Sequence, residues 1–398
     1  MELLTTNNKT VILSAVVVAM LPFANSYAEF DPAVIKAGGV DIVPTLGVSE
    51  SYDSNILYGE STKQGDMITS LKPAVTATVE SGANKYSLKT DAAIGSYSKS
   101  KADNYLDSSF SVDVHQSFTR KIVLDVKAKR ENAHENRGSG YSQGANLTVT
   151  EPDRYSINQV DGEFAYGSRD AIGRIVFRIA SGSRIYNNNR AISKDRDRDN
   201  ASGGATFYYH VMPKTSLLAE FSQQSLVYRN NESYNSNEQR VLVGTRWDIS
   251  ALTSGTAKAG LLRKKFTDAT RVDTSIFSWE IGARWSPLSY SVFDVVTKGT
   301  LDETNGGGNF IESKTLLIKW AHFWNKSIDT AVDVNVTNNK YQPTTRQDNF
   351  RSLGIKTNYN LRRWLDVAAD YRYVINQSTL TGFDYDKNIF TFSLTAAL

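Results

Sequence analysis

The sequence predicts an all-β fold, a transmembrane antiparallel up-and-down β-barrel of about 18 strands, with 16–18 as the range. Apolar and polar residues alternate through most of the chain, which places one kind of side chain on each face of a strand. Charged residues in these stretches fall almost always opposite the apolar ones, as a wall that faces lipid requires. Tight turns also alternate with longer loops along the whole chain, a rhythm that a soluble sandwich does not explain.

The start of the chain reads as a secretory signal peptide. Lys9 precedes an apolar run over 11–23, and a small-x-small cleavage site follows at 24–28. We expect cleavage after about Ala28. The apolar run is shorter than the roughly 20 residues that a membrane-spanning helix needs, and no Cys follows it, which excludes a lipid anchor. Residues 29–39 then form a short, irregular periplasmic segment, and 40–398 form the barrel.

Composition is compatible with this fold. The 20 Tyr, 17 Phe and 6 Trp residues suffice for aromatic girdles at the membrane surfaces. A mean hydropathy of −0.38 fits a barrel, because half of the strand residues of a channel face water. The absence of Cys excludes disulfides and thiolate metal sites. A net charge of +3 favours neither nucleic acid nor a polybasic membrane patch.

The strands follow one another in hairpins. In chain order we expect them at about 42–49, 67–79, 85–94, 106–115, 122–129, 164–166, 174–179, 203–209, 217–223, 240–248, 255–266, 277–285, 290–300, 316–320, 328–336, 353–359, 365–373 and 387–398. Tight turns fall near residues 82, 120, 169, 213, 251, 288, 325 and 361. Outer-membrane barrels keep short turns on the periplasmic side, so both termini are expected there.

The last strand has the clearest alternation. Its apolar set is Phe390, Phe392, Leu394, Ala396 and Leu398; small polar residues lie between them, with Ala397 as the only break. This pattern resembles the closing strand of bacterial outer-membrane barrels, although that strand usually ends in Phe. An edge strand of a soluble sandwich is the alternative, and the turn rhythm argues against it.

The inner face should be hydrated and of mixed charge. Charged residues that alternate with the apolar ones along a strand are assigned to this face. They are Lys72, Lys89, Asp91, Asp113, Lys127, Arg178, Arg246, Glu280, Arg284, Asp333, Asp370 and Arg372. They could line a path for a charged solute, or they could simply pair with one another as in any porin wall. The charged run 194–199 is expected to be a solvated loop, and 306–308 a flexible one.

No catalytic, metal or cofactor site is expected. The four His residues have no H-E-x-x-H spacing, and no Gly-x-Ser-x-Gly elbow occurs. A barrel hydrolase would need a Ser–His pair, and although His115 faces the lumen by parity, the sequence indicates no partner Ser for it.

Short motifs spread over the chain resemble a family of Gram-negative outer-membrane proteins described as putative beta-barrel porins. They are Ser51–Ile56, Pro213–Leu218, Arg246–Asp248, Trp285–Pro287, Gly306–Gly308, Leu361–Leu365 and Phe383–Asp386. The resemblance implies a wide outer-membrane barrel. It also implies an association with exopolysaccharide or capsule production.

Three functions are therefore open. The first is a passive conduit for secreted polysaccharide, working with a periplasmic export partner. The second is a general or solute-specific uptake porin, and the third is a non-conducting barrel that scaffolds an assembly. In each case the expected partners include outer-membrane lipid and the barrel assembly machinery, and nucleic acid is not expected.

Overall fold

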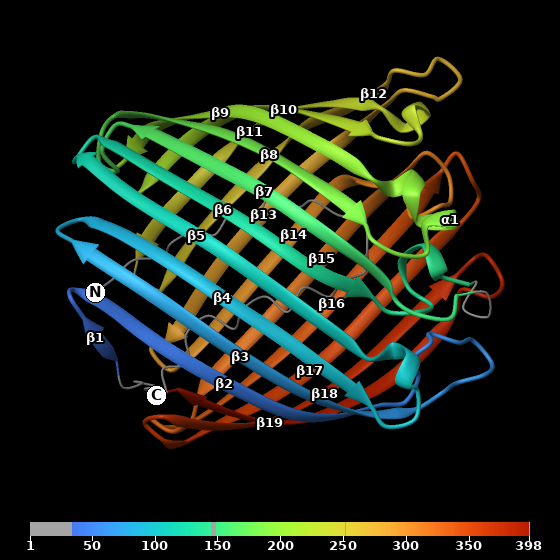
Figure 1. The fold of residues 1–398 in the computed structure, drawn as a ribbon. Helices are drawn as coiled ribbons and strands as arrows, with labels where there is room; N and C mark the ends of the chain where they lie inside the picture. Colours follow the sequence, from blue (N-terminus) through green and yellow to red (C-terminus); the bar gives the residue numbers. More distant parts are fainter. Residues whose placement is uncertain (1–33, 145–148, 251, 398) are drawn as a thin grey trace.

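The structure, a computed structural model, describes residues 34–144, 149–250 and 252–397. One antiparallel sheet of 19 strands forms the molecule, and 18 of them, β2 to β19, close into a barrel (Figure 1). Each strand pairs with the next one along the chain. The ring closes where β19 pairs with β2, from Ile389 opposite Asp53 to Ala397 opposite Thr45. The predicted fold class and strand number are confirmed.

Most strands are longer than the alternating stretches from which the sequence predicts them. The first nine barrel strands are β2 (Val40–Asp53), β3 (Asp66–Ser81), β4 (Asn84–Tyr97), β5 (Tyr105–Thr119), β6 (Ile122–Glu135), β7 (Asp153–Tyr166), β8 (Gly173–Tyr186), β9 (Arg198–Met212) and β10 (Thr215–Tyr228). The other nine are β11 (Ser236–Ser250), β12 (Thr253–Phe266), β13 (Thr274–Leu288), β14 (Ser291–Glu303), β15 (Phe310–Phe323), β16 (Ile328–Gln342), β17 (Gln347–Arg362), β18 (Leu365–Ser378) and β19 (Tyr385–Ala397).

Helices occur only as single turns between strands within the described residues. They are η1 (Lys101–Asp103), η2 (Gly140–Ser142), α1 (Arg190–Ser193), η3 (Lys194–Arg196) and η4 (Glu232–Tyr234). None of these helices has the length and apolar character needed to cross a membrane.

The segment before the barrel is more regular than predicted. A short strand, β1 (Ile35–Ala37), folds back on the start of β2 through a turn at Gly38 and Gly39, both with positive φ. Glycine tolerates this left-handed backbone, whereas other residues strain in it. The irregular segment predicted over 29–39 is therefore wrong for 35–37. The signal peptide 1–28, its cleavage point at Ala28 and the terminal Leu398 lie outside the described residues.

The two ends of the barrel differ, as the turn rhythm predicts. All eight predicted tight turns lie at one end, which we call the turn end, together with β1 and the end of β19 (Figure 1). The nine remaining connections lie at the opposite end, the loop end. The longest of them is the 136–152 connection between β6 and β7. An even strand number places both ends of the barrel sheet at the turn end.

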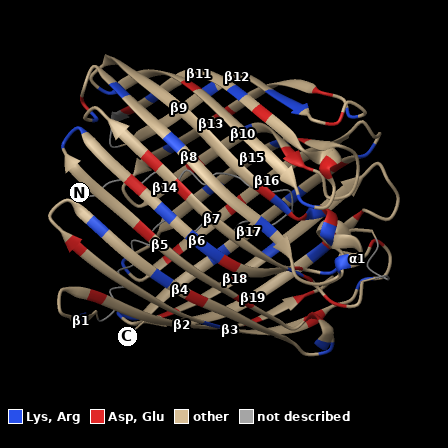
Figure 2. Cartoon of the chain, turned by 45° about the horizontal axis from the view of Figure 1, so that its top comes forward, with Lys and Arg blue, Asp and Glu red and all other residues tan. Residues whose placement is uncertain are grey.

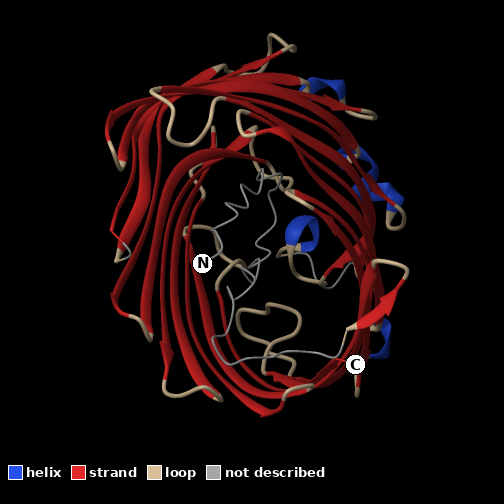
Figure 3. Cartoon of the chain, turned by 90° about the vertical axis from the view of Figure 1, so that its left-hand side faces the viewer, coloured by secondary structure: helices blue, strands red, loops and turns tan. Residues whose placement is uncertain are grey.

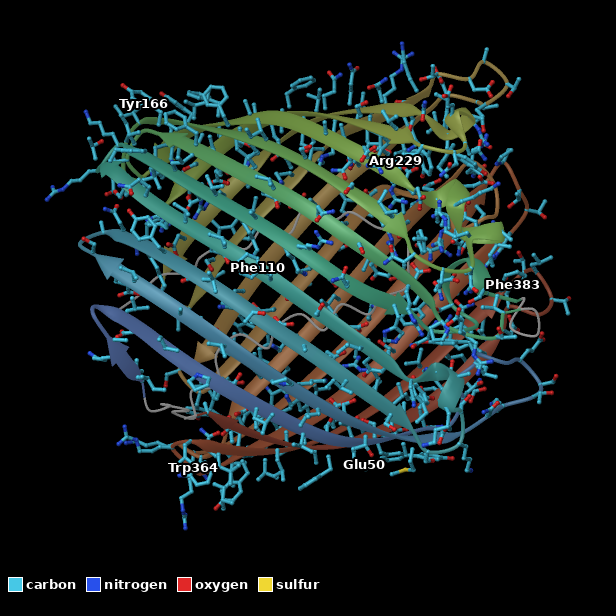
Figure 4. The ribbon with its side chains drawn as sticks, viewed as in Figure 1. Glu50, Phe110, Tyr166, Arg229, Trp364 and Phe383 are labelled. Atoms are coloured by element: carbon cyan, nitrogen blue, oxygen red, sulfur yellow. The ribbon has the colours of Figure 1, made fainter. Side chains whose placement is uncertain are left out.

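The outer face is apolar, and its aromatic girdle is one-sided. Five of the six Trp residues lie at the turn end, namely Trp247, Trp285, Trp320, Trp324 and Trp364. Tyr166 and Trp364 mark this girdle in Figure 4. The apolar set of the last strand belongs to this face, since Phe390 and Phe392 are 52% and 53% exposed and pair with Tyr52 and Glu50.

The separation of charge from the lipid face has exceptions that the sequence did not predict. Glu50, Arg130, Arg263, Lys314 and Arg351 share the outer face with the apolar residues and are exposed. All five lie in the half of their strands nearer the loop end.

The barrel interior holds no single apolar core. Two small apolar clusters lie near the loop end, one of Leu262, Leu301 and Phe310 and one of Phe350, Val374 and Tyr385. Most other buried residues on the inner face are polar or charged. The interior of this barrel is therefore a polar wall, and function is to be sought there.

Candidate functional site

The twelve charged residues predicted to line the lumen all lie on the inner face. The register places each of them opposite residues of the neighbouring strands that also alternate with the exposed apolar set. Figure 2 shows that Lys, Arg, Asp and Glu occur along the strands on all sides of the barrel. The inner wall is therefore charged around its whole circumference.

A continuous band of polar contacts crosses seven consecutive strands of this wall. Arg178 on β8 reaches Glu163 on β7 at 2.8 Å and Thr206 on β9 at 2.9 Å. The Thr206 hydroxyl in turn donates to Glu220 on β10 at 3.4 Å.

The band continues through two cations that share two carboxylates. Arg240 on β11 lies 3.0 Å from Glu220 and 3.5 Å from Glu280, and Lys258 on β12 lies 3.1 Å and 3.2 Å from the same two groups. We call this set the charged belt. Its members are Glu163, Arg178, Thr206, Glu220, Arg240, Lys258 and Glu280. Only Arg178 and Glu280 are among the twelve predicted residues. Glu163 and Glu220 lie on β7 and β10, which alternate less clearly in sequence.

Most other predicted lumen residues also form ion pairs. These are Lys89 with Asp91 at 3.3 Å, Lys127 with Asp113 at 3.1 Å, Arg284 with Asp294 at 2.7 Å and Arg372 with Asp333 at 2.8 Å. Lys72, Arg246 and Asp370 form no salt bridge with any described residue. Most charged side chains of the wall thus form ion pairs with one another, and a few form none.

The leftover charges are not distributed evenly. Arg174 on β8 and Arg246 on β11 form no salt bridge with a described residue, and neither do Asp366 and Asp370 on β18. All four lie toward the turn end of their strands. In the ring of 18 strands, β18 is seven strands from β11 and eight from β8 in the other direction. Arg174 and Arg246 therefore lie across the ring from Asp366 and Asp370, and Lys356 lies opposite Asp370 on the neighbouring strand.

Loops narrow the loop end of the lumen. The view along the barrel in Figure 3 shows loop segments within the ring of strands. The described part of the 136–152 loop crosses to loops far away in the ring. Its Gln143 side-chain oxygen accepts hydrogen bonds from Arg346 at 2.9 Å and from Asn305 at 3.1 Å. Asn136, at the start of the loop, donates to the Tyr58 hydroxyl at 3.3 Å. The loop is thus held from three sides.

A buried ionic cluster anchors the same loop to the wall. Glu135 at the end of β6 is contacted by Arg184 from β8 and, at 3.0 Å, by Arg196 from η3. The guanidinium of Arg196 also lies 3.7 Å above the ring of Tyr141. Burial lowers the pKa of Arg196, but the Glu135 carboxylate outweighs this effect and raises the pKa above its usual value.

Close packing in this anchor requires a glycine. Gly140 has a φ of +56°, and a Cβ at this position would lie 2.3 Å from an oxygen of Glu135. The anchor overturns one prediction, since the run 194–199 is not a solvated loop. Arg196, Asp197 and Arg198 are 3–4% exposed, because carboxylates and rings from other strands surround them.

Further buried pairs fix the rim of the mouth. Lys387 lies 2.6 Å from Asp53 across the barrel closure, and Arg346 donates to Asp348 at 3.0 Å. Lys264 is fully buried between Glu238, at 2.9 Å, and Glu303. Burial of single charges is costly, so each of these cations is held by a carboxylate. The rim is therefore a rigid, polar frame.

The structure contains a Ser–His pair that the sequence did not indicate. The Ser216 hydroxyl lies 3.1 Å from Nδ1 of His210 on the adjacent strand. No carboxylate among the described residues contacts this His, so the pair lacks the group that orients a catalytic imidazole. His115 instead contacts Asp125 at 2.6 Å. No group of three or more potential metal ligands occurs within the described ranges.

Comparisons with known proteins agree with this architecture. A family model described as Putative beta-barrel porin 2 matches residues 28–398. Among solved structures, the outer membrane protein OpdK from Pseudomonas aeruginosa superposes with a TM-score of 0.52 at 10% identity, covering 90% of this chain and 99% of that chain. The structure of the same protein with vanillate gives the same values. Among curated proteins, none matches this sequence.

Proposed function

The chain belongs to the Putative beta-barrel porin 2 family, and from this premise we propose that it is an outer-membrane channel for small, hydrated, charged solutes. Such solutes would cross by diffusion, without chemistry or a cofactor. The family and the fold are those of channels and not of enzymes. The lumen wall, and the charged belt above all, carries the proposal.

The charged belt supports passage because its charges are already paired. Three cations and three carboxylates contact one another along β7 to β13, so the wall offers hydration without a strong net charge. Conduction needs binding that is favourable but weak. The leftover Arg174 and Arg246, opposite Asp366 and Asp370, would orient a charged solute without trapping it.

The narrowed loop end favours small solutes over a polymer. The hydrogen bonds of Gln143 to Asn305 and Arg346 hold the 136–152 loop across the mouth. The solved OpdK structure with vanillate, a small solute, agrees with an uptake channel. Uptake is therefore the function we propose. Nothing in the lumen or in the matching proteins supports the predicted export of exopolysaccharide with a periplasmic partner.

The orientation follows from the general rule that outer-membrane barrels keep short turns in the periplasm. We place the turn end there and the loop end outside the cell. Residues 1–28 would act as a signal peptide cleaved after about Ala28, and the β19 strand would be presented to the barrel assembly machinery. The side chains of the charged belt would then line the path from the outer mouth to the periplasm.

Reconstitution separates the candidate functions. The purified barrel, inserted into planar bilayers, should give discrete conductance steps. Liposomes that carry it should swell in small charged solutes and not in a long-chain polysaccharide. The absence of any conductance would contradict the channel and favour a scaffold. Equal permeation by the polymer would favour the export conduit.

A further inference from the structure

On four strands, the outer face carries a cation between its apolar residues and the loop end. On each of these strands an apolar residue of the outer face is followed, two positions toward the loops, by Arg or Lys. The pairs are Ala128 and Arg130 on β6, Leu261 and Arg263 on β12, Leu316 and Lys314 on β15, and Leu353 and Arg351 on β17. The apolar band is therefore capped by positive charge.

Five cations gather on one side of the barrel. Arg263, Lys265, Lys314, Lys340 and Arg351 lie on the outer face between β12 and β17, and we call them the basic arc. The register joins three of them closely. Lys314 lies opposite Asn338 on β16, two residues from Lys340, and Val336 on the same strand lies opposite Arg351.

These charges are largely unused within the chain. Lys314 contacts Glu312 at 3.1 Å. Arg263, Lys265, Lys340 and Arg351 form no salt bridge with any residue that the structure describes. Arg263, Lys265 and Arg351 are also exposed. Four cations without a salt bridge, two on β12 and one each on β16 and β17, leave a positive potential along this side of the barrel for an external anion.

The opposite rim of the apolar band is built differently. At the turn end the outer face carries the Trp and Tyr girdle, with Trp247, Trp285 and Trp320 among its members. Trp364 and Tyr166 of this girdle are labelled in Figure 4. Aromatic rings of this kind suit the headgroup level of ordinary phospholipid. Cations in the corresponding place on the other rim suit a layer of anionic headgroups. The two rims therefore indicate two chemically different leaflets.

A pocket adjoins one part of the basic arc at the loop end. Its lining comes from the loops at the rim and from the ends of β13, β15 and β16, and includes Thr274, Asn309, Glu312 and Gln342. Glu312 lies opposite Lys340 on β16 and 3.1 Å from Lys314, so the pocket adjoins these two cations of the arc. Hydroxyl, amide and carboxylate groups at this height are suited to the hydroxyls of a sugar.

We propose that the basic arc binds the phosphate groups of a phosphorylated glycolipid in the outer leaflet, with the sugar against the rim pocket. The inference rests on the proposed function for the direction of the loop end. The acyl chains would lie along the apolar strands beneath the arc. Coulombic attraction to the phosphates would retain this lipid through purification.

The test uses the full-length barrel in detergent and bis-phosphorylated lipid A as the probe, with binding measured by native mass spectrometry. The variant neutralises the arc by R263Q, K265Q, K314Q and R351Q together. We expect affinity to fall about tenfold or more, given the contribution of each surface cation. Dephosphorylated lipid A should bind the unmodified protein as weakly as the probe binds the variant.

The matched control removes the same charge from the other rim, by R120Q, K121Q, R169Q and K326Q, residues that are all exposed at the turn end. It should retain lipid A binding. Equal loss in both variants, or unchanged binding in the arc variant, would overturn the proposal, as would a second copy of the chain occupying the arc in place of lipid. If the arc variant does not fold, lipid A binding by the unmodified protein is measured at high salt instead. Loss of binding at high salt supports the basic arc as the site, and unchanged binding contradicts it.

Conductance distinguishes a failure of this inference from a failure of the proposed function. An arc variant that conducts normally but no longer binds lipid A supports the lipid site. A protein that binds lipid A through the arc but never conducts would contradict the channel and leave the lipid site standing.

Discussion

Arg240 on β11 lies 3.0 Å from the carboxylate of Glu220 on β10, and Lys258 on β12 reaches the same carboxylate at 3.1 Å. Two cations from consecutive strands thus converge on one carboxylate of the lumen wall. Glu220 and Lys258 are each only 11% exposed at the side chain. The contact therefore has consequences both for stability and for the electrostatics of the pore.

Neutralising Lys258 should destabilise the barrel. The K258Q variant leaves Glu220 and Glu280 to share Arg240 alone, so the largely buried Glu220 carboxylate loses a partner. We expect the free energy of unfolding to fall by about 1–3 kcal/mol. Urea unfolding in detergent measures it. The control is K127Q, whose pair with Asp113 is about half exposed and should cost less than about 1 kcal/mol. Equal losses would contradict a special role for the belt.

Arg246 and Asp370 should set ion selectivity in opposite directions. R246Q removes a positive charge from the β11 wall, and D370N removes a negative charge from the β18 wall. We expect the reversal potential in a salt gradient to shift toward cation preference in the first and toward anion preference in the second. Planar-bilayer recordings measure this shift. A shift of the same sign in both would mean that the two residues do not face a common solute path.

Releasing the 136–152 loop should widen the mouth. Q143A removes the acceptor that binds Arg346 at 2.9 Å and Asn305 at 3.1 Å. The loop then loses its attachment to the far side of the ring, and single-channel conductance should rise. The control is Q239A, a Gln exposed on the outer face of β11, which should conduct as the unmodified protein does. Unchanged conductance in Q143A would place the narrowest point elsewhere.

The anchor at Glu135 should be intolerant of neutralisation. Its side chain is 2% exposed and holds both Arg184 and Arg196. E135Q would leave the buried Arg184 without a carboxylate and Arg196 with only Asp153, at 3.8 Å, at a cost of about 3–5 kcal/mol. Limited proteolysis should then cut the loop-end connections. E151Q, which removes a half-exposed partner of Arg154, should remain resistant, and cleavage of both variants alike would argue against the anchor.

The two faces of the last strand should respond differently to charge. F392R puts a cation on the outer face, where it costs up to about 2–4 kcal/mol in lipid. S393R puts the same cation on the inner face, where water solvates it. The folded fraction, read from the gel shift between unboiled and boiled samples, should fall in F392R only. A fall in S393R alone would reverse the assignment of the faces.

Much of the fold could be predicted because it depends on local pattern. The closing strand alternates between apolar and polar residues from Phe390 to Ala396. Turn residues such as Gly82 and Pro213 separate one alternating stretch from the next. Lipid enforces this pattern on every strand independently, so each strand can be read without its neighbours. Alternation assigned the twelve predicted lumen residues to one face of their strands for the same reason.

The mouth could not be predicted because it depends on contacts distant in sequence. The run 194–199 reads as a solvated loop, yet Arg196 is buried because Glu135, 61 residues earlier, lies beside it. In the charged belt, Thr206 was missed because the small residues Gly203 and Gly204 weaken the alternation of β9. The outer-face cations Arg130 and Arg351 were missed because the strands extend beyond their apolar cores.

Single-channel recording of the unmodified barrel tests the central claim most directly. The account predicts discrete conductance steps in planar bilayers, together with swelling of liposomes in small charged solutes. A correctly folded barrel that gives no steps, with the gel shift of an unboiled β-barrel intact, would contradict a diffusion channel through a polar lumen.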